Sequence, residues 1–322
     1  MSAPKGLLAA NLVCMISMVV WAAGLPANAI LLPLLPPLSL SAARFGMAAA
    51  ALLPLWVAVE GFGVLRGAQW LKGIAVGGMI GIGGLCVILG QSLTDAVTVA
   101  VISATMPVVA IAIEVVLDGR RLTLAIVAGL ALAVVGGIIA LGGGVDGLSL
   151  GLGALICFGS VLFFTFGSRL TVTAFPVLTP LGRTAVTLTG AAIGTIIIAL
   201  VHAVRFLPMP DFGQIGPGES GMMMVLAVPN FGQLGPREWG ALVVFAVGSL
   251  AVSQVLWIIS VGKLGIGLAA LHINAAPFYV MLILFAFGDP WNWQQAFGAA
   301  IVGLGVLVAQ GIIPLQRKPI AV

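Results

Sequence analysis

Charged residues are scarce in this sequence. Asp, Glu, Lys and Arg make up 7% of its 322 residues, whereas soluble globular domains carry about 25%. This scarcity excludes an ordinary water-soluble domain. The 13 Lys and Arg residues are also scattered along the chain rather than clustered, which argues against a nucleic-acid-binding surface.

Cysteine and histidine are scarce too. The three cysteines, Cys14, Cys86 and Cys157, lie in apolar runs, where a thiol behaves as a small hydrophobic group. The two histidines, His202 and His272, fall near the ends of different apolar runs and cannot by themselves form a zinc or acid–base site. We therefore expect no disulfide, no metal site and no cofactor.

Signatures of ATP hydrolysis and of metal-dependent catalysis are missing as well. A GxxxxGK[ST] phosphate loop does not occur, because Gly262 and Lys263 are followed by Leu264 and lack the upstream glycine. The HExxH motif and an aspartate-rich prenyl-diphosphate motif do not occur either. We predict that the chain is not an enzyme.

Long apolar runs take up most of the chain, and 61% of the residues are hydrophobic. A run of about 20 residues crosses a hydrocarbon core of about 30 Å, and it must form a helix because a lipid-facing backbone has to satisfy its own hydrogen bonds. We predict an all-α polytopic membrane protein with ten transmembrane helices, at residues 8–32, 38–59, 71–92, 96–117, 122–142, 148–169, 176–202, 238–261, 265–287 and 294–313.

Basic residues gather on one side of this predicted topology. The tails and loops on the side of the N-terminus hold Lys5, Arg66, Lys72, Arg120, Arg121, Arg169, Lys263, Arg317 and Lys318. The opposite side has Arg205 and Arg237, both in one long loop. By the positive-inside rule we expect a multi-pass protein of the bacterial cytoplasmic (inner) membrane with both termini in the cytoplasm.

The second half of the chain repeats the first. Residues 95–141 return in recognisable form as residues 265–310. Five spans is an odd number, so the second copy must enter the membrane from the opposite side. We expect two inverted five-helix repeats, residues 1–144 and 145–322, around a central cavity, which is a common plan of secondary transporters.

The segment at about 203–237 departs from this compact plan. It is rich in Gly and Pro and contains a local duplication, residues 210–217 and 229–236. We predict an extracytoplasmic loop insertion. Its run Met222–Met224 either forms a short interfacial helix or belongs to an incidental insertion.

These features resemble the drug/metabolite transporter superfamily, and specifically its ten-span exporters built from two EamA domains. The resemblance rests on the duplicated halves, on Arg44 and Arg183, each seven residues after a proline, and on the Pro107 and Pro277 helices. Within that group the chain is most similar to YddG-type exporters of aromatic amino acids. The resemblance implies a basket of helices around a central cavity that opens alternately to each side, without covalent chemistry.

Polar and aromatic side chains at helical spacing mark candidate ligand positions. One stripe joins Ser17, Trp21, Gly24 and Asn28, and a second joins Ser249, Ser253, Trp257 and Ser260. Such stripes suit a planar, partly apolar ligand, although the same residues also serve helix packing. The predicted substrate-binding residues are Trp21, Asn28, Ser103, Thr105, Phe164, Ser253, Trp257, His272 and Tyr279.

Two of these candidates have an alternative interpretation that the residues leave open. His272 is either a binding or proton-relay group or a packing histidine whose hydrogen bonds are satisfied. Phe163 and Phe164 either form part of an aromatic wall or face lipid.

Pro107 and Pro277 are predicted to break helices from within. A proline inside a helix removes one hydrogen bond and frees the carbonyl four residues earlier, here that of Ser103 or Ile273. The freed carbonyls are candidate ligands, unless the two kinks serve packing alone.

Arg44 and Arg183 are predicted to be structural charges. Each lies one or two turns inside its span, close enough to the interface for the guanidinium to reach water, and carboxylate binding is the alternative role. Glu114, near Arg120 and Arg121, is predicted to form an ion pair at the cytoplasmic end. Deeper positions carry no Lys or Arg, which disfavours phosphate-bearing ligands.

We therefore predict a secondary transporter that exports small, largely apolar metabolites, foremost aromatic or other amino acids. An exporter of lipophilic or quaternary cationic drugs is the alternative, and an intramembrane enzyme or assembly factor is disfavoured. The expected partners are a small-molecule substrate, either amino acids or amphipathic metabolites, and the lipid bilayer, and a monomer is expected to suffice. The spans hold no central Asp or Glu, so the coupling ion stays open.

Overall fold

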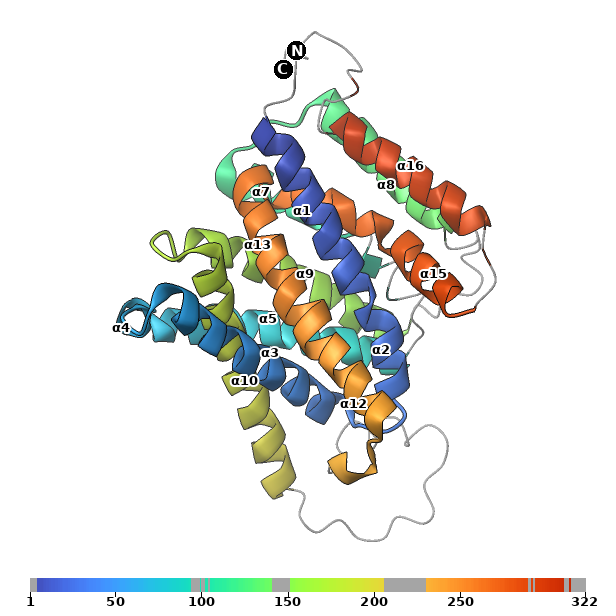
Figure 1. The fold of residues 1–322 in the computed structure, drawn as a ribbon. Coiled ribbons are helices and arrows are strands. Elements are labelled where there is room, and N and C mark those ends of the chain that lie inside the picture. Colours follow the sequence, from blue (N-terminus) through green and yellow to red (C-terminus); the bar gives the residue numbers. More distant parts are fainter. Residues whose placement is uncertain are drawn as a thin grey trace.

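The structure, a computed structural model, describes residues 5–93, 99, 102–103, 105–140, 151–205, 230–288, 291, 293–309 and 313. All regular elements of this described part are helices (Figure 1), which confirms the all-α prediction. Six helical stretches are long and apolar enough to cross a membrane, namely Gly6–Leu31, Pro37–Glu60, Trp70–Leu93, Leu152–Thr173, Pro180–Val201 and Pro236–Leu264. That the chain crosses the membrane ten times remains a prediction.

The described helices fall before and after residue 145. Those before residue 145 are α1 (Lys5–Ala22), α2 (Gly24–Leu31), α3 (Pro37–Glu60), α4 (Val64–Gly67), α5 (Trp70–Leu93), α7 (Met106–Asp118) and α8 (Leu124–Ala140). Those after it are α9 (Leu152–Thr173), α10 (Pro180–Arg205), η2 (Phe231–Gln233), α12 (Pro236–Val243), the π-helical η3 (Val244–Val252), α13 (Ser253–Leu264), α14 (Ile266–Ala270), the 3₁₀-helical η4 (Leu271–Ala275), α15 (Ala276–Ala286) and α16 (Trp293–Ala309).

Proline and glycine set several helix boundaries. Helix α3 starts with Pro37, whose missing N–H would have no helical partner in the first turn. Helix α7 is followed by Gly119, whose backbone is in the left-handed region with φ of 64°. Gly265, with φ of 80°, separates α13 from α14. Glycine adopts such positive φ angles without the steric cost that a Cβ brings.

Helix α5 lies between α9 and α10 and is the centre of one bundle. Helix α3 joins this bundle by packing on α10. Helix α1 packs along α13, and α14 packs on α7. Helices α8 and α16 lie side by side at one edge of the molecule (Figure 1). The contacts thus join helices from before and after residue 145 throughout the bundle.

Glycines at four-residue spacing on α5, Gly73, Gly77 and Gly81, form a ridge that lets α5 and α10 approach at backbone distance. A Cβ on Gly77 would overlap the carbonyl oxygen of Thr187 and would lie 2.6 Å from the backbone nitrogen of Ala191. A Cβ on Gly81 would lie 3.3 Å from the Ala191 carbonyl oxygen. The ridge therefore packs α5 against α10.

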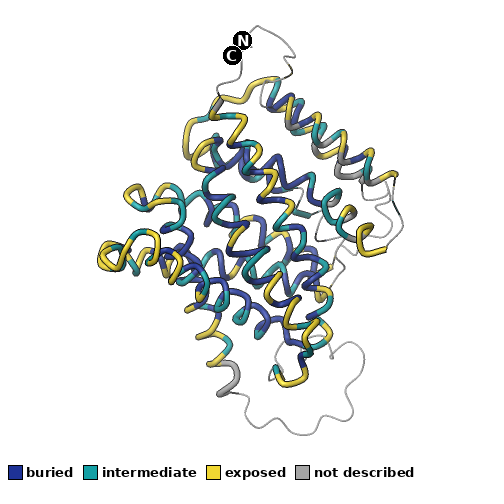
Figure 2. The backbone as a smooth tube through the Cα atoms, viewed as in Figure 1, coloured by how far each residue is buried: buried dark blue, intermediate teal, exposed yellow. Residues whose placement is uncertain are grey.

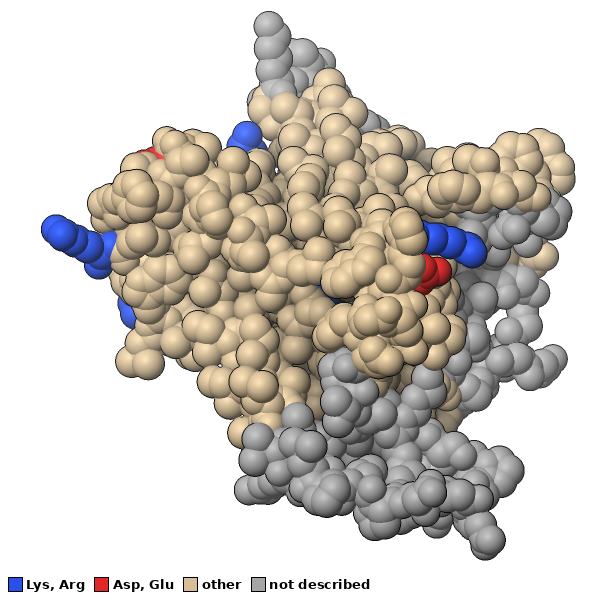
Figure 3. Space-filling model, turned by 60° about the horizontal axis from the view of Figure 1, so that its bottom comes forward, with Lys and Arg blue, Asp and Glu red and all other residues tan. Residues whose placement is uncertain are grey.

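Buried residues lie along the helix contacts, and exposed ones lie on the outer faces (Figure 2). Many outer side chains are large and apolar, such as Leu155 on α9, Val116 on α7 and Ile197 on α10. The face shown in Figure 3 is mostly uncharged, with charged side chains at a few separate places. Because so large an apolar surface is unstable in water, the described helices form a multi-pass protein embedded in the membrane.

Charged side chains tie the end of α7 to its neighbours. Buried Glu114 forms an ion pair with Arg120, as predicted, and its Oε1 accepts a hydrogen bond of 2.9 Å from the Gly267 N–H. Asp118 pairs with Arg169 of α9, whose Nε donates to Oδ2 at 3.1 Å. These bonds fix α7 to α14 and to α9.

The predicted extracytoplasmic loop insertion lies mostly outside the described residues, including Met222–Met224. Its described end, from Asn230, holds η2, and Gln233 Nε2 donates a hydrogen bond of 2.5 Å to the Leu34 carbonyl after α2. This bond places the end of the segment against the connection between α2 and α3.

We predict that Gly77→Ala destabilises the protein and that Gly78→Ala, one residue away, does not. A Cβ on Gly78 would meet no atom within 4 Å, so this change brings only the helix-propensity gain of about 0.5–1 kcal/mol. Gly77→Ala has the same gain but incurs overpacking against backbone, at about 1–3 kcal/mol. Melting temperatures in detergent check this, and equal values for the two variants would contradict the close contact of α5 and α10.

Candidate substrate-binding site

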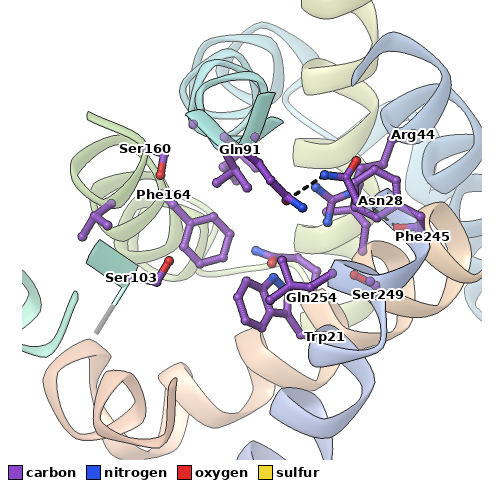
Figure 4. Close-up of a pocket in the computed structure, with 18 of the residues that line it drawn as sticks. Trp21, Asn28, Arg44, Gln91, Ser103, Ser160, Phe164, Phe245, Ser249 and Gln254 are labelled. Carbon is purple, nitrogen blue, oxygen red and sulfur yellow. Dashed lines mark hydrogen bonds between the residues drawn. The ribbon is translucent and has the colours of Figure 1, made fainter. Parts of the chain in front are cut away.

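A cavity of about 800 Å³, continuous with open space, lies where helices from the two halves of the chain meet. Its walls come from α1, α2, α3 and α5 on one part and from α9, η3 and α13 on the other, with Ile273 of η4 and Met106 of α7 (Figure 4).

Aromatic side chains form one wall of this cavity. Trp21 of α1 and Phe164 of α9 point into it from opposite helices (Figure 4). Phe164 also contacts the ring of Trp257, with centroids 6.3 Å apart and planes tilted by 33°. Rings arranged in this way suit a flat apolar group.

A second, smaller cavity of about 260 Å³ adjoins the first. The two share Trp21, Phe164, Gln254 and Ile273 as lining residues. The smaller one adds Ser17, Met18, Ser253 and Trp257. The predicted polar stripes of the first and eighth spans therefore meet at these two neighbouring spaces.

Amide and hydroxyl groups also line the larger cavity (Figure 4). Asn28 Nδ2 donates a hydrogen bond of 2.8 Å to Gln91 Oε1 and so links α2 to α5 (Figure 4). Asn28 Oδ1, Ser249 Oγ and Gln254 Nε2 are buried and lack a hydrogen-bond partner among the described residues. Since each unsatisfied buried polar group costs about 1–3 kcal/mol, this wall is suited to the polar groups of a ligand.

Arg44 lies on the same polar wall. Its Nε donates a hydrogen bond of 3.3 Å to the Phe245 carbonyl, and its guanidinium carbon lies 4.0 Å from the centre of the Phe245 ring. The residue is 5% exposed. The expectation that this guanidinium reaches the membrane surface is therefore wrong, because the side chain turns inward onto η3.

This placement brings a basic group to the lining of the cavity. Seven residues of helix after Pro37 put Arg44 about 10 Å along α3, which is far enough to reach the cavity. Arg183 differs, because it lines neither cavity and its Nε donates at 2.8 Å to the carbonyl of Phe175. Arg183 holds the linker before α10, as a structural charge would.

The structure brings together most of the predicted substrate-binding residues. Trp21, Asn28, Ser103 and Phe164 line the larger cavity, and Ser253 and Trp257 line the smaller one. Thr105, His272 and Tyr279 line neither. Phe163, the neighbour of Phe164, is 36% exposed on the outer face of α9.

Local bonds account for two of the residues outside the cavities. The Thr105 hydroxyl donates a hydrogen bond of 2.6 Å to the Ile102 carbonyl. His272 is buried, with Nδ1 3.2 Å from the Ala269 oxygen one turn earlier. The packing interpretation of His272 therefore fits its surroundings better than a ligand-binding role.

The two prolines lie at the starts of helices rather than within them. Pro107 is the second residue of α7, after a turn at Thr105, and Pro277 is the second residue of α15, after the 3₁₀ turn of η4. Proline is tolerated in a first turn because its N–H is not needed there. The Ile273 carbonyl is not free, since the N–H of Ala276 donates to it, which corrects the expected ligand role of this carbonyl.

Sequence reasoning missed Gln91, Gln254 and Phe245 as lining residues. A signal for the two glutamines was present, because polar amides are rare and costly inside apolar runs. Phe245 had no such signal, since phenylalanine is common on lipid-facing and packing surfaces alike. Its role comes from the inward turn of Arg44, which sequence spacing does not show.

We predict that Trp257 and Ser168 contribute to stability as a pair. Trp257 Nε1 donates a hydrogen bond of 3.1 Å to Ser168 Oγ between two buried side chains of α13 and α9. Trp257→Phe and Ser168→Ala should each lower the free energy of unfolding by about 1 kcal/mol or more, with a coupling of about 0.5–1.5 kcal/mol in the double variant. Unfolding in detergent measures the coupling, and additive effects would show that the bond does not contribute.

Comparison with known proteins finds a family resemblance in the first half of the chain. The model of the EamA-like transporter family matches residues 8–142. The uncharacterized transporter YyaM of Bacillus subtilis (strain 168) is 26% identical over 292 residues, which cover 87% of each chain. A solved crystal structure matches with a TM-score of 0.69 at 21% identity, over 94% of this chain and 97% of the other; at that identity the likeness shows the fold alone. The match of residues 8–142 and the likeness to YyaM support a general role in membrane transport, and this part of the chain is similar to EamA-like transporter domains.

Proposed function

We propose that the protein is a secondary transporter that exports small, largely apolar metabolites, foremost aromatic amino acids, across the bacterial cytoplasmic membrane by alternating access. The observation that carries this proposal is the cavity between the two halves, with Trp21 and Phe164 on one wall and polar groups on the other. Such a cavity suits a ligand with a flat apolar body and a polar end. Helices of a single chain surround it, so we propose that the monomer is the functional unit.

The helix contacts support two inverted five-helix repeats. In that arrangement α1 corresponds to α9, α3 to α10, α5 to η3 and α13, α7 to α15, and α8 to α16. The packing of α5 on α9 then has its counterpart in α13 on α1, and that of α5 on α10 in η3 on α3. The pairs α3–α10 and α8–α16 each join a helix to its own counterpart, as helices beside a twofold axis between the halves would.

An even number of spans places both ends of the chain on one side of the membrane. The start of α1 and the end of α16 lie toward the same end of the molecule (Figure 1). The loops on that side of the predicted topology hold most of the basic residues, so we propose that both termini are cytoplasmic.

Transport of lipophilic or quaternary cations is the second candidate. The aromatic wall favours it, because ring faces attract cations. Arg44 on the lining opposes it, since like charges repel strongly where water is scarce.

Catalysis has weaker support. One serine motif of enzymes, GxSxG, matches the spacing at residues 147–151. That motif acts between a strand and a helix, however, and the described residues around it are helical. The EamA-like domain indicates transport instead.

We expect the purified protein in liposomes to take up labelled tryptophan and phenylalanine saturably, and threonine much less. Phe164→Ala should raise the KM for tryptophan about tenfold, because stacking of an aromatic pair is worth about 0.5–1.5 kcal/mol beyond its buried area. Phe163→Ala is the matched control on the outer face of α9 and should leave the KM unchanged. Uptake of a planar cation without uptake of any amino acid would instead support the drug-exporter alternative.

We predict that a C-terminal fusion to a fluorescent protein that folds in the cytoplasm is bright, and that a fusion to periplasmic alkaline phosphatase is inactive. The reason is the positive-inside charge bias of the predicted loops. An active phosphatase fusion would contradict the cytoplasmic C-terminus, and with it either the orientation or the even number of spans.

A further inference from the structure

We propose that the Arg44 guanidinium binds a carboxylate group of the transported molecule, so that the cavity selects amphipathic carboxylates over amides and cations of the same shape. This role rests on the proposed transport function and names the chemical group that the site recognises.

Arg44 is a buried charge without a countercharge in the described part of the chain. The ion pairs found there, Arg120 with Glu114 and Arg169 with Asp118, lie elsewhere. The described lining of both cavities contains no Asp or Glu. Because a buried charge is strongly unfavourable unless it is paired, the missing partner fits an anion that arrives with the substrate.

The contacts of Arg44 orient the guanidinium without neutralising it. One of its five N–H donors bonds the Phe245 carbonyl, and the Phe245 ring lies against its face. The described residues supply no hydrogen-bond acceptor for its terminal nitrogens. A planar fork of free donors is the geometry that matches the two oxygens of a carboxylate.

Two further donors on the same lining lack partners. Ser249, four residues after Phe245, and Gln254 are both buried, and Ser249 Oγ and Gln254 Nε2 have no hydrogen-bond partner among the described residues. Both line the cavity with Arg44 (Figure 4). The three groups together offer an anion a cation and two neutral donors.

An acceptor and an apolar wall complete the complementarity. The Oδ1 of Asn28, a residue of the cavity lining, is an acceptor without a hydrogen-bond partner among the described residues, and such an acceptor suits the ammonium group of an amino acid. Trp21 and Phe164 face the remainder of the ligand. A molecule with a carboxylate at one end and a ring at the other therefore satisfies both walls.

Ligand binding to the purified protein in detergent tests this role, with the shift in melting temperature as the readout. The probes are two matched pairs, indole-3-propionate with its primary amide and octanoate with octanamide, together with the cation tryptamine. We expect the carboxylates to bind the parent about 10- to 100-fold more tightly than their amides, and tryptamine not to bind. Arg44→Gln should abolish the preference, and Arg44→Lys should keep part of it.

Arg183→Gln is the matched control, because Arg183 occupies the corresponding place in the second half and lies outside both cavities. This variant should keep the carboxylate preference but melt at a lower temperature, since it loses hydrogen bonds to the Phe175 and Pro176 carbonyls. The ligand-free Arg44→Gln protein should melt at the same or a higher temperature than the parent, because it loses an uncompensated charge. A lower melting temperature with an unchanged carboxylate preference would assign Arg44 a packing role and overturn the proposal.

Measurements of binding and of uptake distinguish a failure of the carboxylate-binding role of Arg44 from a failure of the proposed transport function. Equal binding of carboxylates and amides, or no binding of either carboxylate, overturns the anion site. Arg44-dependent carboxylate binding without uptake in liposomes leaves the anion site standing and counts against transport. If Arg44→Gln does not fold, Arg44→Lys decides, because a carboxylate affinity equal to that of the parent would contradict the need for a planar fork.

Discussion

The close contact of α5 with its neighbours is the constraint on which the rest of the structure depends. Gly77 and Gly81 bring α5 against the backbone of α10, and Gly83 does the same toward Phe164 and Ser160 of α9. In a membrane, apolar surface gives helices no drive to associate in preference to lipid, so this packing at backbone distance carries much of the association. It also fixes the face of α5 that lines the cavity.

The cavity exists because packing on its two sides is unequal. Toward the ends of α1 and α13 where Ala10 and Val261 lie, a dense apolar cluster fills the space between the halves. Nearer to Arg44, Gly24 and Gly84 belong to the lining of the cavity, and Ser249 and Phe45 pack where side chains at these two positions would lie. The surrounding polar groups are not all satisfied. Three buried polar atoms without a partner among the described residues, Asn28 Oδ1, Ser249 Oγ and Gln254 Nε2, belong to residues of this lining. Because unpaired buried polar groups lower stability, these three favour a site shaped for a ligand over packing alone.

Helix content and membrane character could be predicted from the sequence, because both follow from local properties. Apolar runs of sufficient length and the backbone's need for internal hydrogen bonds lead to helices whatever the neighbours are. The stripe containing Trp21 and Asn28 was also visible from helical spacing. The helix breaks were predicted near the right places, but Pro107 and Pro277 proved to begin helices, because proline is best tolerated in a first turn.

The sequence by itself determined the helical membrane class, the ridge of glycines on α5 and part of the aromatic wall, since each depends on spacing along one helix. The tertiary structure decided which polar groups meet. Spacing placed Arg44 near a helix end but could not show that η3, some 200 residues later in the chain, supplies the carbonyl and ring that hold it inward. It likewise could not show that His272 bonds within its own turn while Gln91 reaches Asn28. Such contacts depend on how helices distant in the chain are oriented and packed against one another, and the spacing of residues along one helix does not determine that orientation.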